Sequence, residues 1–345
     1  MAIGVRPGTL ASDRLCAIRL LAHHLNPAYD TERFDWLHMR NPAGPGRFWM
    51  AFDAATGETV GTAAAFPRLF SVGGREERGW VLGDFCVSDS YRSLGPAIKL
   101  QRTCLELATD SDTPFCYDFP SQAMMSVYQR LRIHPRGQMH RLVKLLRIEG
   151  KLVALIGLPG VSGSLGRALD RFLALARRSP VDPSVALELH ADRCGEEFSQ
   201  LAETENPSYG ICLMRSAAYL NWRYRENPIA RYEILTARRR GRLVAYAVFI
   251  HAADTAAVVD LFGSQERAVL DAVVRGVIAV ARQRGCARLD VAILDSHPWV
   301  PMFRRLGFSP REARPFVLSA SPHSRVAEAI QSPAGLFIMN GDRDS

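Results

Sequence analysis

The sequence lacks the cysteine spacing of a disulfide framework and of a structural zinc site. Its seven cysteines are odd in number and scattered over 345 residues, and no two form a Cys-x-x-Cys pair. Disulfide-rich secreted domains pair their cysteines, and zinc sites need closely spaced ligands. We therefore expect reduced thiols, no bound metal and a cytoplasmic location.

Long apolar runs are also missing. No apolar core follows the first residues, so no signal peptide is predicted. The apolar stretch over residues 152–166 is short and contains five helix-breaking residues: Gly157, Pro159, Gly160, Gly163 and Gly166. A membrane-spanning helix needs about 20 apolar residues. We therefore expect no transmembrane segment, with a membrane-surface role as a secondary alternative.

The chain is basic, but its basic runs lack interleaved aromatic residues. The formal net charge is +8 at pH 7, and much of the excess lies within residues 238–242 and 304–314. Single-strand binding surfaces combine such charge with aromatic side chains. Each run taken alone has the character of a solvated face. We therefore expect anionic small molecules, and not DNA, as partners.

The chain contains an internal repeat. The segment from Trp36 to Pro42 recurs, in its Trp, Asn and Pro residues, as Trp222 to Pro228, and each copy is followed by two strand-like runs joined by a turn. Two later matches follow in the same order: Asp84 with Asp260, and Tyr128 with Phe303. A repeat of this length predicts two related domains, which also suits a chain of this size at about 150 residues per domain.

Several elements are predicted from periodicity and capping signals. Helices are expected over residues 12–25 and 31–40, the second capped by Asp30. Strand-like runs follow up to Val87. Later elements of the first copy are a helix over 96–109, a strand over 113–118, a helix over 122–131 and a closing strand over 141–148.

A strand–turn–helix junction in the first copy has the character of an anion site. The strand-like run 79–87 breaks into a turn at residues 91–97, and the helix follows. The first turn of a helix has backbone N–H groups without internal partners, and the helix dipole is positive there. Gly95 permits close approach of a phosphate, and Pro96 suits the first helical position.

Two motifs in the first copy resemble those of the GNAT acyltransferases. The motif Arg92-x-x-Gly95-x-Ala97 resembles the Arg/Gln-x-x-Gly-x-Gly/Ala motif that cradles the pyrophosphate of acetyl-CoA in that family. Residues 126–133 resemble the late GNAT segment Leu-Tyr-Glu-Lys-Leu-Gly-Phe, with Tyr128 at the Tyr position and Arg132 where glycine is usual. The second copy, residues 303–308, is closer to that ending.

The resemblance implies an α/β fold of the α+β type. We expect two tandem GNAT folds, each a mixed, mostly antiparallel twisted sheet flanked by helices. The expected organisation is an acyl-CoA-binding domain over 1–150, a connector over 151–183, a degenerate second domain over 184–320 and a tail over 321–345. The tail has a helix-like run and a strand-like run, and its terminal acidic residues are expected to be solvated, because they lack a calcium-loop spacing.

The resemblance also implies acetyl-CoA, or another acyl-CoA, as co-substrate. The cofactor-binding residues carried over from the family motif and the strand before it are Val87, Arg92, Ser93, Leu94, Gly95 and Ala97. The second copy reads Gln265 to Leu270 at this position, without glycine and with Glu266 facing the pyrophosphate. We therefore expect one cofactor site per chain, in the first copy.

The catalytic prediction rests on a phenol and two carboxylates. By resemblance, Tyr128 lies near the acyl-CoA sulfur and assists the leaving thiolate, whereas Phe303 of the second copy cannot donate a proton. Asp84 is the preferred general base, with a pKa raised by burial, and Asp118 is its rival. The recurrence of Asp84 as Asp260 also fits a structural role. Two histidines near turns are weaker alternatives: His134 and His140.

The predicted function is transfer of an acetyl or acyl group from acetyl-CoA to an amine by direct attack. The acceptor is expected to be a small molecule, and the positive charge suggests an anionic amino sugar or sugar nucleotide. One alternative is an aminoacyl-tRNA-dependent transferase, whose tandem-GNAT architecture is similar and whose partner would be tRNA. Another is a non-catalytic CoA-binding or scaffold protein.

Overall fold

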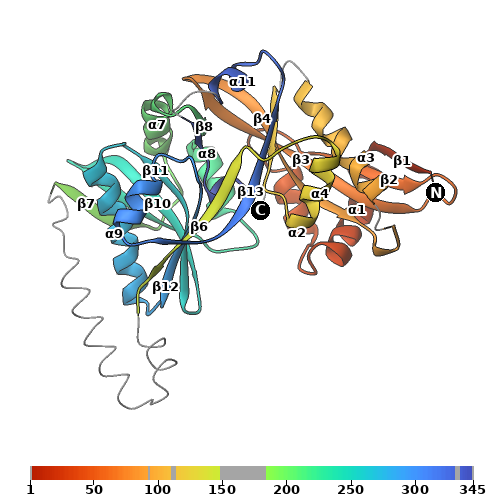
Figure 1. The fold of residues 1–345 in the computed structure, drawn as a ribbon. Coiled ribbons are helices and arrows are strands. Elements are labelled where there is room, and N and C mark those ends of the chain that lie inside the picture. The colour runs from red at the N-terminus through yellow and green to blue at the C-terminus, as the bar shows by residue number, and fades with distance from the viewer. Residues whose placement is uncertain (1, 92–93, 110–113, 148–183, 331–334, 344–345) are drawn as a thin grey trace.

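The computed structural model describes residues 2–91, 94–109, 114–147, 184–330 and 335–343. The predicted connector, together with Arg92 and Ser93, lies outside these residues. The described chain forms two lobes joined by long central strands (Figure 1). No helix within the described ranges is both long and apolar enough to cross a bilayer.

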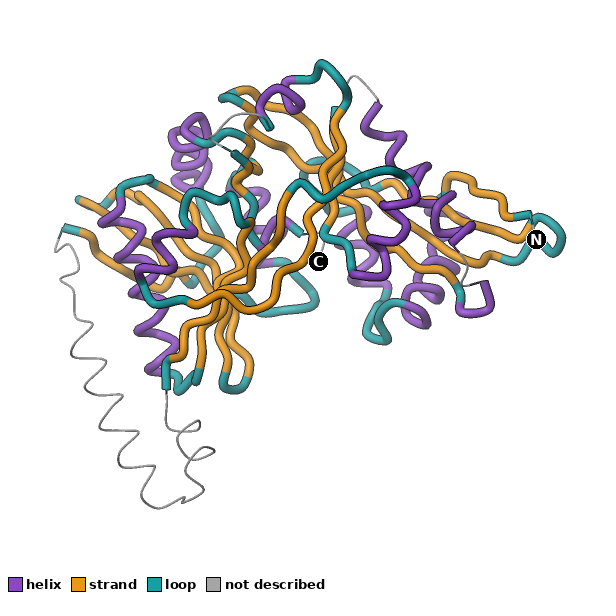
Figure 2. The backbone as a smooth tube through the Cα atoms, viewed as in Figure 1, coloured by secondary structure: helices purple, strands orange, loops and turns teal. Residues whose placement is uncertain are grey.

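One continuous sheet of 14 strands runs through both lobes (Figure 2). The strands of the first half are β1 (Ile3–Pro7), β2 (Arg47–Asp53), β3 (Thr59–Val72), β4 (Arg75–Val87), β5 (Phe115–Asp118) and β6 (Gly137–Leu145). The second half contributes β7 (Val185–His190), β8 (Ile211–Leu213), β9 (Glu233–Arg239), β10 (Arg242–Ala252), β11 (Thr255–Gly263), β12 (Arg288–Leu294), β13 (Ser309–Ala320) and β14 (Leu336–Phe337). Within each half most neighbours are antiparallel, and β4–β5 and β11–β12 are parallel.

Helices cover both faces of this sheet. Those of the first half are α1 (Leu10–His24), α2 (Thr31–His38), α3 (Leu94–Leu105) and α4 (Gln122–Arg130). Those of the second half are α7 (Glu196–Glu205), α8 (Ala217–Leu220), α9 (Arg267–Gln283), α10 (Val300–Arg305) and α11 (Arg325–Ala329). The predicted cap of α2 is confirmed, because the Asp30 carboxylate accepts a hydrogen bond from the Arg33 backbone N–H at 2.9 Å.

The alternation of side chains along β3 separates two layers of core. Ala63 and Ala65 belong to a buried cluster with Leu100 of α3, whereas Ala64 and Phe66 belong to the cluster that contains the buried face of α1. Successive residues of a strand point to opposite faces, so one strand supports helices on both sides. Both faces of β3 are buried, which explains why apolar residues occur at successive positions over residues 63–67.

The two halves exchange their last strands. β13, from the second half, pairs with β5 of the first half through Val317–Ala320, and β6, from the first half, pairs with β12 of the second. β6 and β13 also pair with each other. The strand predicted to close the first half over residues 141–148 therefore begins at Gly137 and completes the sheet of the other half instead. Figure 1 shows these two strands crossing between the lobes.

The repeated tryptophans meet at the centre of the molecule. The Trp36 and Trp222 rings stack with centroids 4.9 Å apart. The indole N–H of each donates to the backbone carbonyl of the other, both at 2.9 Å. Two equivalent residues that make the same contact with each other lie about a local two-fold axis. The sequence repeat is thus also a structural repeat at this point.

Candidate functional site

A gap opens between β4 and β5 in the first half. The two strands pair only from Gly79 to Val81, and beyond this point they diverge. At the same level the pairing of β4 with β3 is interrupted by a bulge, and Asp84 takes a φ of 46°. A bulge redirects side chains, and an aspartate tolerates this left-handed conformation better than most residues. The gap is a cavity of about 370 Å³ lined by residues of β3, β4 and α3 and by the segment after β5.

Asp84 lies in this cavity with two uncharged or weakly basic partners. The Tyr29 hydroxyl donates a hydrogen bond to Asp84 Oδ2, and His38 Nε2 lies 3.3 Å from the same oxygen. The His38 ring stacks on Phe34 with centroids 3.9 Å apart, which fixes its orientation. Asp84 is only 3% exposed. The first half therefore holds a buried carboxylate at the edge of an open cavity.

Asp118, at the end of β5, lines the same cavity and contacts Tyr128. The Tyr128 hydroxyl donates to Asp118 Oδ2 at 2.6 Å and accepts a hydrogen bond from Gln101 Nε2 at 2.7 Å. Tyr128 is fully buried behind these two residues, which themselves line the cavity. Burial, and then the Asp118 charge, raise the pKa of Tyr128 well above its usual value. The phenol is therefore protonated at neutral pH and acts as a hydrogen-bond donor.

A thiol also faces the cavity. Cys104 of α3 is among its lining residues. Burial raises the pKa of Cys104 well above its usual value, and it raises the pKa of the neighbouring Cys116 to about 12. The thiolate is the nucleophilic form of cysteine, and neither group forms it at neutral pH.

Some of the predicted site residues lie together in the structure, and others are not among the residues that the structure describes. Asp84 and Asp118 line one cavity, and Tyr128 lies directly behind Asp118. His134 and His140 are not among the residues that line it. Val87 ends β4, and α3 begins at Leu94, which places Gly95 and Ala97 in its first turn. The binding role of these residues, and of Arg92 and Ser93, stays a prediction.

The corresponding gap in the second half is filled by the chain itself. β11 and β12 pair from Thr255 to Val258 and then diverge. The C-terminal tail enters there: the Leu294 N–H donates to the Ile338 carbonyl at 3.2 Å, and Ile293 forms a bridge with Met339. The short 3-10 helix η5 (Asn340–Asp342) follows and packs against β11 and β12. A Cβ added at Gly341 would lie 3.1 Å from the Val259 carbonyl, so the fit is close.

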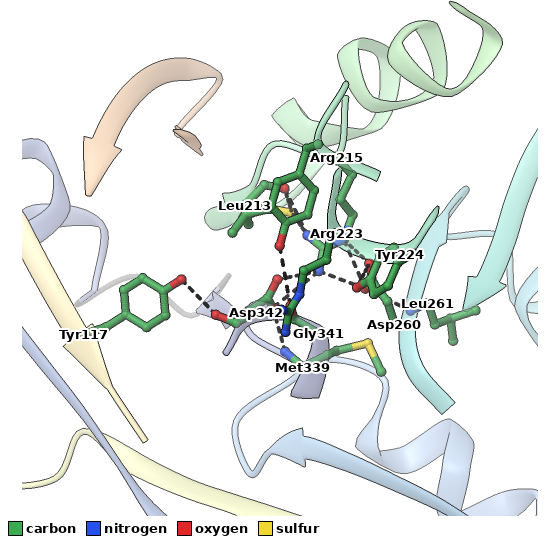
Figure 3. A network of polar contacts seen from close by, with 12 residues as sticks. Tyr117, Leu213, Arg215, Arg223, Tyr224, Asp260, Leu261, Met339, Gly341 and Asp342 are labelled. Carbon is green, nitrogen blue, oxygen red and sulfur yellow. Dashed lines mark hydrogen bonds and ion pairs between the residues drawn. The ribbon is translucent and has the colours of Figure 1, made fainter. Parts of the chain in front are cut away.

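The tail brings a second carboxylate to the buried Asp260 (Figure 3). Arg215 Nε lies 3.0 and 3.1 Å from the two Asp260 oxygens, and Arg215 Nη2 lies 3.0 Å from Asp342 Oδ1. Tyr224 donates to Asp260 at 3.2 Å. The prediction of a solvated acidic end is wrong for Asp342, which is only 1% exposed. Burial raises the pKa of Asp342 to about 6, against the lowering effect of Arg215.

The partners of the two aspartates occupy equivalent positions in the repeat. Tyr29 and His38 in the first half correspond to Arg215 and Tyr224 in the second, at the separation that relates Trp36 to Trp222. Sequence analysis did not single out these residues. The available signal was position alone: the offset of the tryptophan match aligns Tyr29 with Arg215 and His38 with Tyr224, although the residues differ in both pairs. What the sequence did not show is that they contact the aspartates, which lie 36 to 55 residues further on.

Comparison with solved structures identifies the fold. No protein-family model matches the chain, and no curated protein matches it in sequence. A GCN5-related N-acetyltransferase from Anabaena variabilis ATCC 29413 aligns with a TM-score of 0.66 at 11% identity, over 95% of this chain and 75% of that one. A probable N-acyltransferase from Enterococcus faecalis V583 gives 0.67 at 10% identity, with the same coverage. Eis1 from Mycobacterium abscessus gives 0.60 at 15% identity, over 95% and 76%.

These likenesses span both halves and confirm the predicted fold class. The chain is a mixed α/β protein with a large, mostly antiparallel twisted sheet flanked by helices, and its fold is like that of GCN5-related N-acetyltransferases.

Proposed function

Starting from this GNAT-like fold, we propose that the chain is a tandem-GNAT acyltransferase that moves an acetyl or other acyl group from acetyl-CoA to an amine. The reaction is assigned to the cavity between β4 and β5. The observation that carries the proposal is the contrast between the two gaps: one is open and lined by two carboxylates, and the other is filled by residues 338–342.

The first-half gap suits an extended acyl-CoA arm. β4 loses its parallel neighbour after Val81, and the equivalent gap in the second half holds chain residues that pair with β12 at Ile293. We assign the same place in the first half to the acyl-CoA arm. The co-substrate would supply a thioester carbonyl for attack. The residues proposed to hold it are Val87, Arg92, Ser93, Leu94, Gly95 and Ala97.

Proton transfer is assigned to the two carboxylates. An attacking amine must lose a proton, and a carboxylate at the reaction centre can accept it directly or through water. Asp84 is the preferred base and Asp118 is its rival. In the alternative with Asp118 as base, the amine proton taken up by Asp118 Oδ2 would weaken the hydrogen bond from Tyr128. The phenol would then pass its proton to the leaving sulfur and regain one from Asp118. The short Tyr128–Asp118 contact supports this coupling.

Direct attack is favoured over a covalent enzyme intermediate. Cys104 faces the cavity, but burial raises its pKa and keeps the thiol protonated. The pKa of Cys86, next to the bulge on β4, is likewise raised by burial, to about 12. The amine acceptor is therefore proposed to attack the thioester itself.

Two further features belong to the proposal. A cytoplasmic location is supported by the seven cysteines, all of which are free thiols. We propose residues 1–150 and 184–320 as the two domains along the chain, although β6 and β13 each complete the sheet of the other half.

Titration calorimetry with acetyl-CoA tests the proposal. We expect one molecule bound per chain. No binding at near-millimolar acetyl-CoA would overturn it, and two molecules per chain would contradict the assignment of a filled second gap. Binding without turnover against a broad amine panel would favour a non-catalytic CoA-binding protein. Activity that requires aminoacyl-tRNA in place of acetyl-CoA would favour the tRNA-dependent alternative.

The role of Tyr128 has a separate test. Tyr128→Phe removes the hydroxyl and leaves the ring, so we expect turnover to fall at least tenfold with little change in the Kd for acetyl-CoA. The control is Tyr232→Phe, a half-buried tyrosine of the second half. Unchanged turnover in Tyr128→Phe would show that the phenol does not assist the thiolate.

A further inference from the structure

Three arginines from separate elements line the candidate cavity. They are Arg33 on α2, Arg314 on β13 and Arg343 in the tail. The catalytic proposal uses none of them. Because β13 and the tail belong to the second half, the strand exchange and the filled second gap are what bring two of these charges to the first-half cavity.

Arg33 is buried without a counter-ion in the part of the chain that the structure describes. It is 8% exposed, and its Nε has no hydrogen-bond partner there. Its guanidinium lies over the Tyr29 ring, 4.7 Å from the centroid, and Tyr29 in turn donates to Asp84. A buried charge is costly unless it is paired, so an unpaired arginine in the wall of a cavity indicates an anionic ligand.

Arg314 and Arg343 extend the positive surface beyond this cavity. Both also line a second cavity of about 260 Å³, which shares Phe119 with the first. The Arg343 guanidinium lies 5.4 Å from the Phe119 ring centroid. In the second cavity Arg141 differs from them, because it is paired with Asp290 at 2.6 Å and with Glu312 at 2.9 Å. The charge of Arg141 is compensated within the protein.

The position of these arginines separates them from the expected phosphate cradle. That cradle lies at the first turn of α3, whereas α3 lines this cavity through Gln101 and Cys104, later in the helix. The cavity also contains Asp84 and Asp118, which suit an amine. It thus presents carboxylates and guanidinium groups to the same ligand.

We propose that Arg33, Arg314 and Arg343 form an anion-binding subsite for the acceptor, so that the acceptor is an amine that also carries a carboxylate or phosphate group. This assignment rests on the proposed acyl transfer in the same cavity. Guanidinium groups bind both anions with charge-assisted, often bidentate hydrogen bonds.

The test is calorimetric titration of the full chain at saturating acetyl-CoA, which occupies the phosphate cradle. The probes are inorganic phosphate, glycine and the neutral glycinamide. We expect phosphate or glycine to bind in the millimolar range, and Arg33→Gln and Arg343→Gln to weaken that binding at least fivefold. The matched control is Arg311→Gln, an exposed position of β13 that lines neither cavity. Phosphate and glycine distinguish the two anion classes.

Two outcomes would overturn the subsite: no binding of either anion to the wild type, or equal binding by Arg33→Gln and Arg311→Gln. A parallel loss of acetyl-CoA affinity in Arg33→Gln would assign Arg33 to the co-substrate instead. Arg33→Lys keeps the charge and checks folding, with retained anion binding expected. If the wild type does not bind acetyl-CoA, the acyltransferase proposal fails, whereas the same anion titration without acetyl-CoA still decides the subsite.

Discussion

The gap between β4 and β5 and the gap between β11 and β12 have the same construction but different contents. In each, two parallel strands pair briefly and then diverge, and an aspartate lies just beyond the paired segment. Asp84 has Tyr29 and His38 as partners and faces a cavity. Asp260 has Arg215 and Tyr224, and the tail covers it.

This difference shows that two copies of one fold can take different roles, because one leaves its gap open as a cavity and the other fills it with its own chain. Asp260 is ion-paired with a guanidinium inside the protein, whereas Asp84 contacts a phenol and an imidazole and lines an open cavity. The tail also fills the gap between β11 and β12, at the place where the first half has its cavity. The second copy therefore contributes β13 and Arg343 to the surroundings of the first-half cavity, while its own gap is filled.

The largest effect is expected from breaking the buried ion-pair cluster of the second half. Arg215→Met leaves Asp260 and Asp342 without their shared cation, so we expect the free energy of unfolding to fall by about 3 to 5 kcal/mol. Urea denaturation measures it, with the exposed Arg231→Met as control. A loss below about 1 kcal/mol would mean that the cluster does not hold the tail in place.

The next effect concerns the two equivalent aspartates. Asp84→Asn should lower turnover about 100-fold with little change in acetyl-CoA affinity, because the variant cannot accept the amine proton. Asp260→Asn should instead lower stability. The turnover of the folded variant should stay within about threefold of the wild type, because Asp260 takes no part in the proposed proton transfer. Steady-state kinetics of both variants and of Asp118→Asn decide the base: a larger loss in Asp118→Asn transfers the role to Asp118.

The raised pKa of Asp342 should make the stability of the protein depend on pH. Its folded-state pKa of about 6 lies above the value of about 3.9 for an unfolded chain. The folded state then holds this proton more tightly, so the contribution to stability is complete below about pH 4 and is lost as the pH rises through about 6.

Asp342→Asn removes this titration. Between pH 4 and 7, the unfolding free energy of Asp342→Asn should therefore rise relative to the wild type by about 2 to 3 kcal/mol. Urea titrations at each pH measure it, and the exposed Asp192→Asn is the control. Parallel stability profiles for wild type and Asp342→Asn would contradict the raised pKa.

The smallest effect concerns the turn after α4 and its counterpart after α10. Arg132 has a φ of 59°, and Gly307 has a φ of 86° at the equivalent position. Residues with a side chain are disfavoured at such positive φ values, whereas glycine is not. Arg132→Gly should therefore stabilise the protein by about 0.5 to 1 kcal/mol. Gly307→Ala should destabilise it, since the added Cβ would lie 2.9 Å from Lys144 Nζ. Thermal unfolding of both variants checks the pair, and destabilisation by Arg132→Gly would contradict it.

Local patterns predicted much of the fold but not the choice of strand partners. The α2 cap at Asp30, the end of β4 at Val87 and the start of α4 at Gln122 all depend on residues close in sequence. The partners of β6 and β13 do not, because an alternating strand pattern specifies a face and not a neighbour. The sequence therefore predicted two sheets but not the exchange that joins them.

The candidate site was also predicted only in part. Asp84, Asp118 and Tyr128 were predicted from their positions in the first copy, and the structure places all three at or behind one cavity. Arg33, Arg314 and Arg343 could not be associated from sequence, because Arg33 lies more than 280 residues before the other two. Asp342 was expected in solvent, since a short acidic tail gives no sign of the buried Arg215 that it meets.

The sequence by itself determined the repeat, the mixed α/β class and the strand–turn–helix junction, because periodicity, glycine and helix capping act over a few residues. Only the tertiary structure decided which gap stays open, which charges line it and where the tail lies. Those outcomes depend on the burial of charged and apolar groups from distant segments, and burial is a property of the assembled chain.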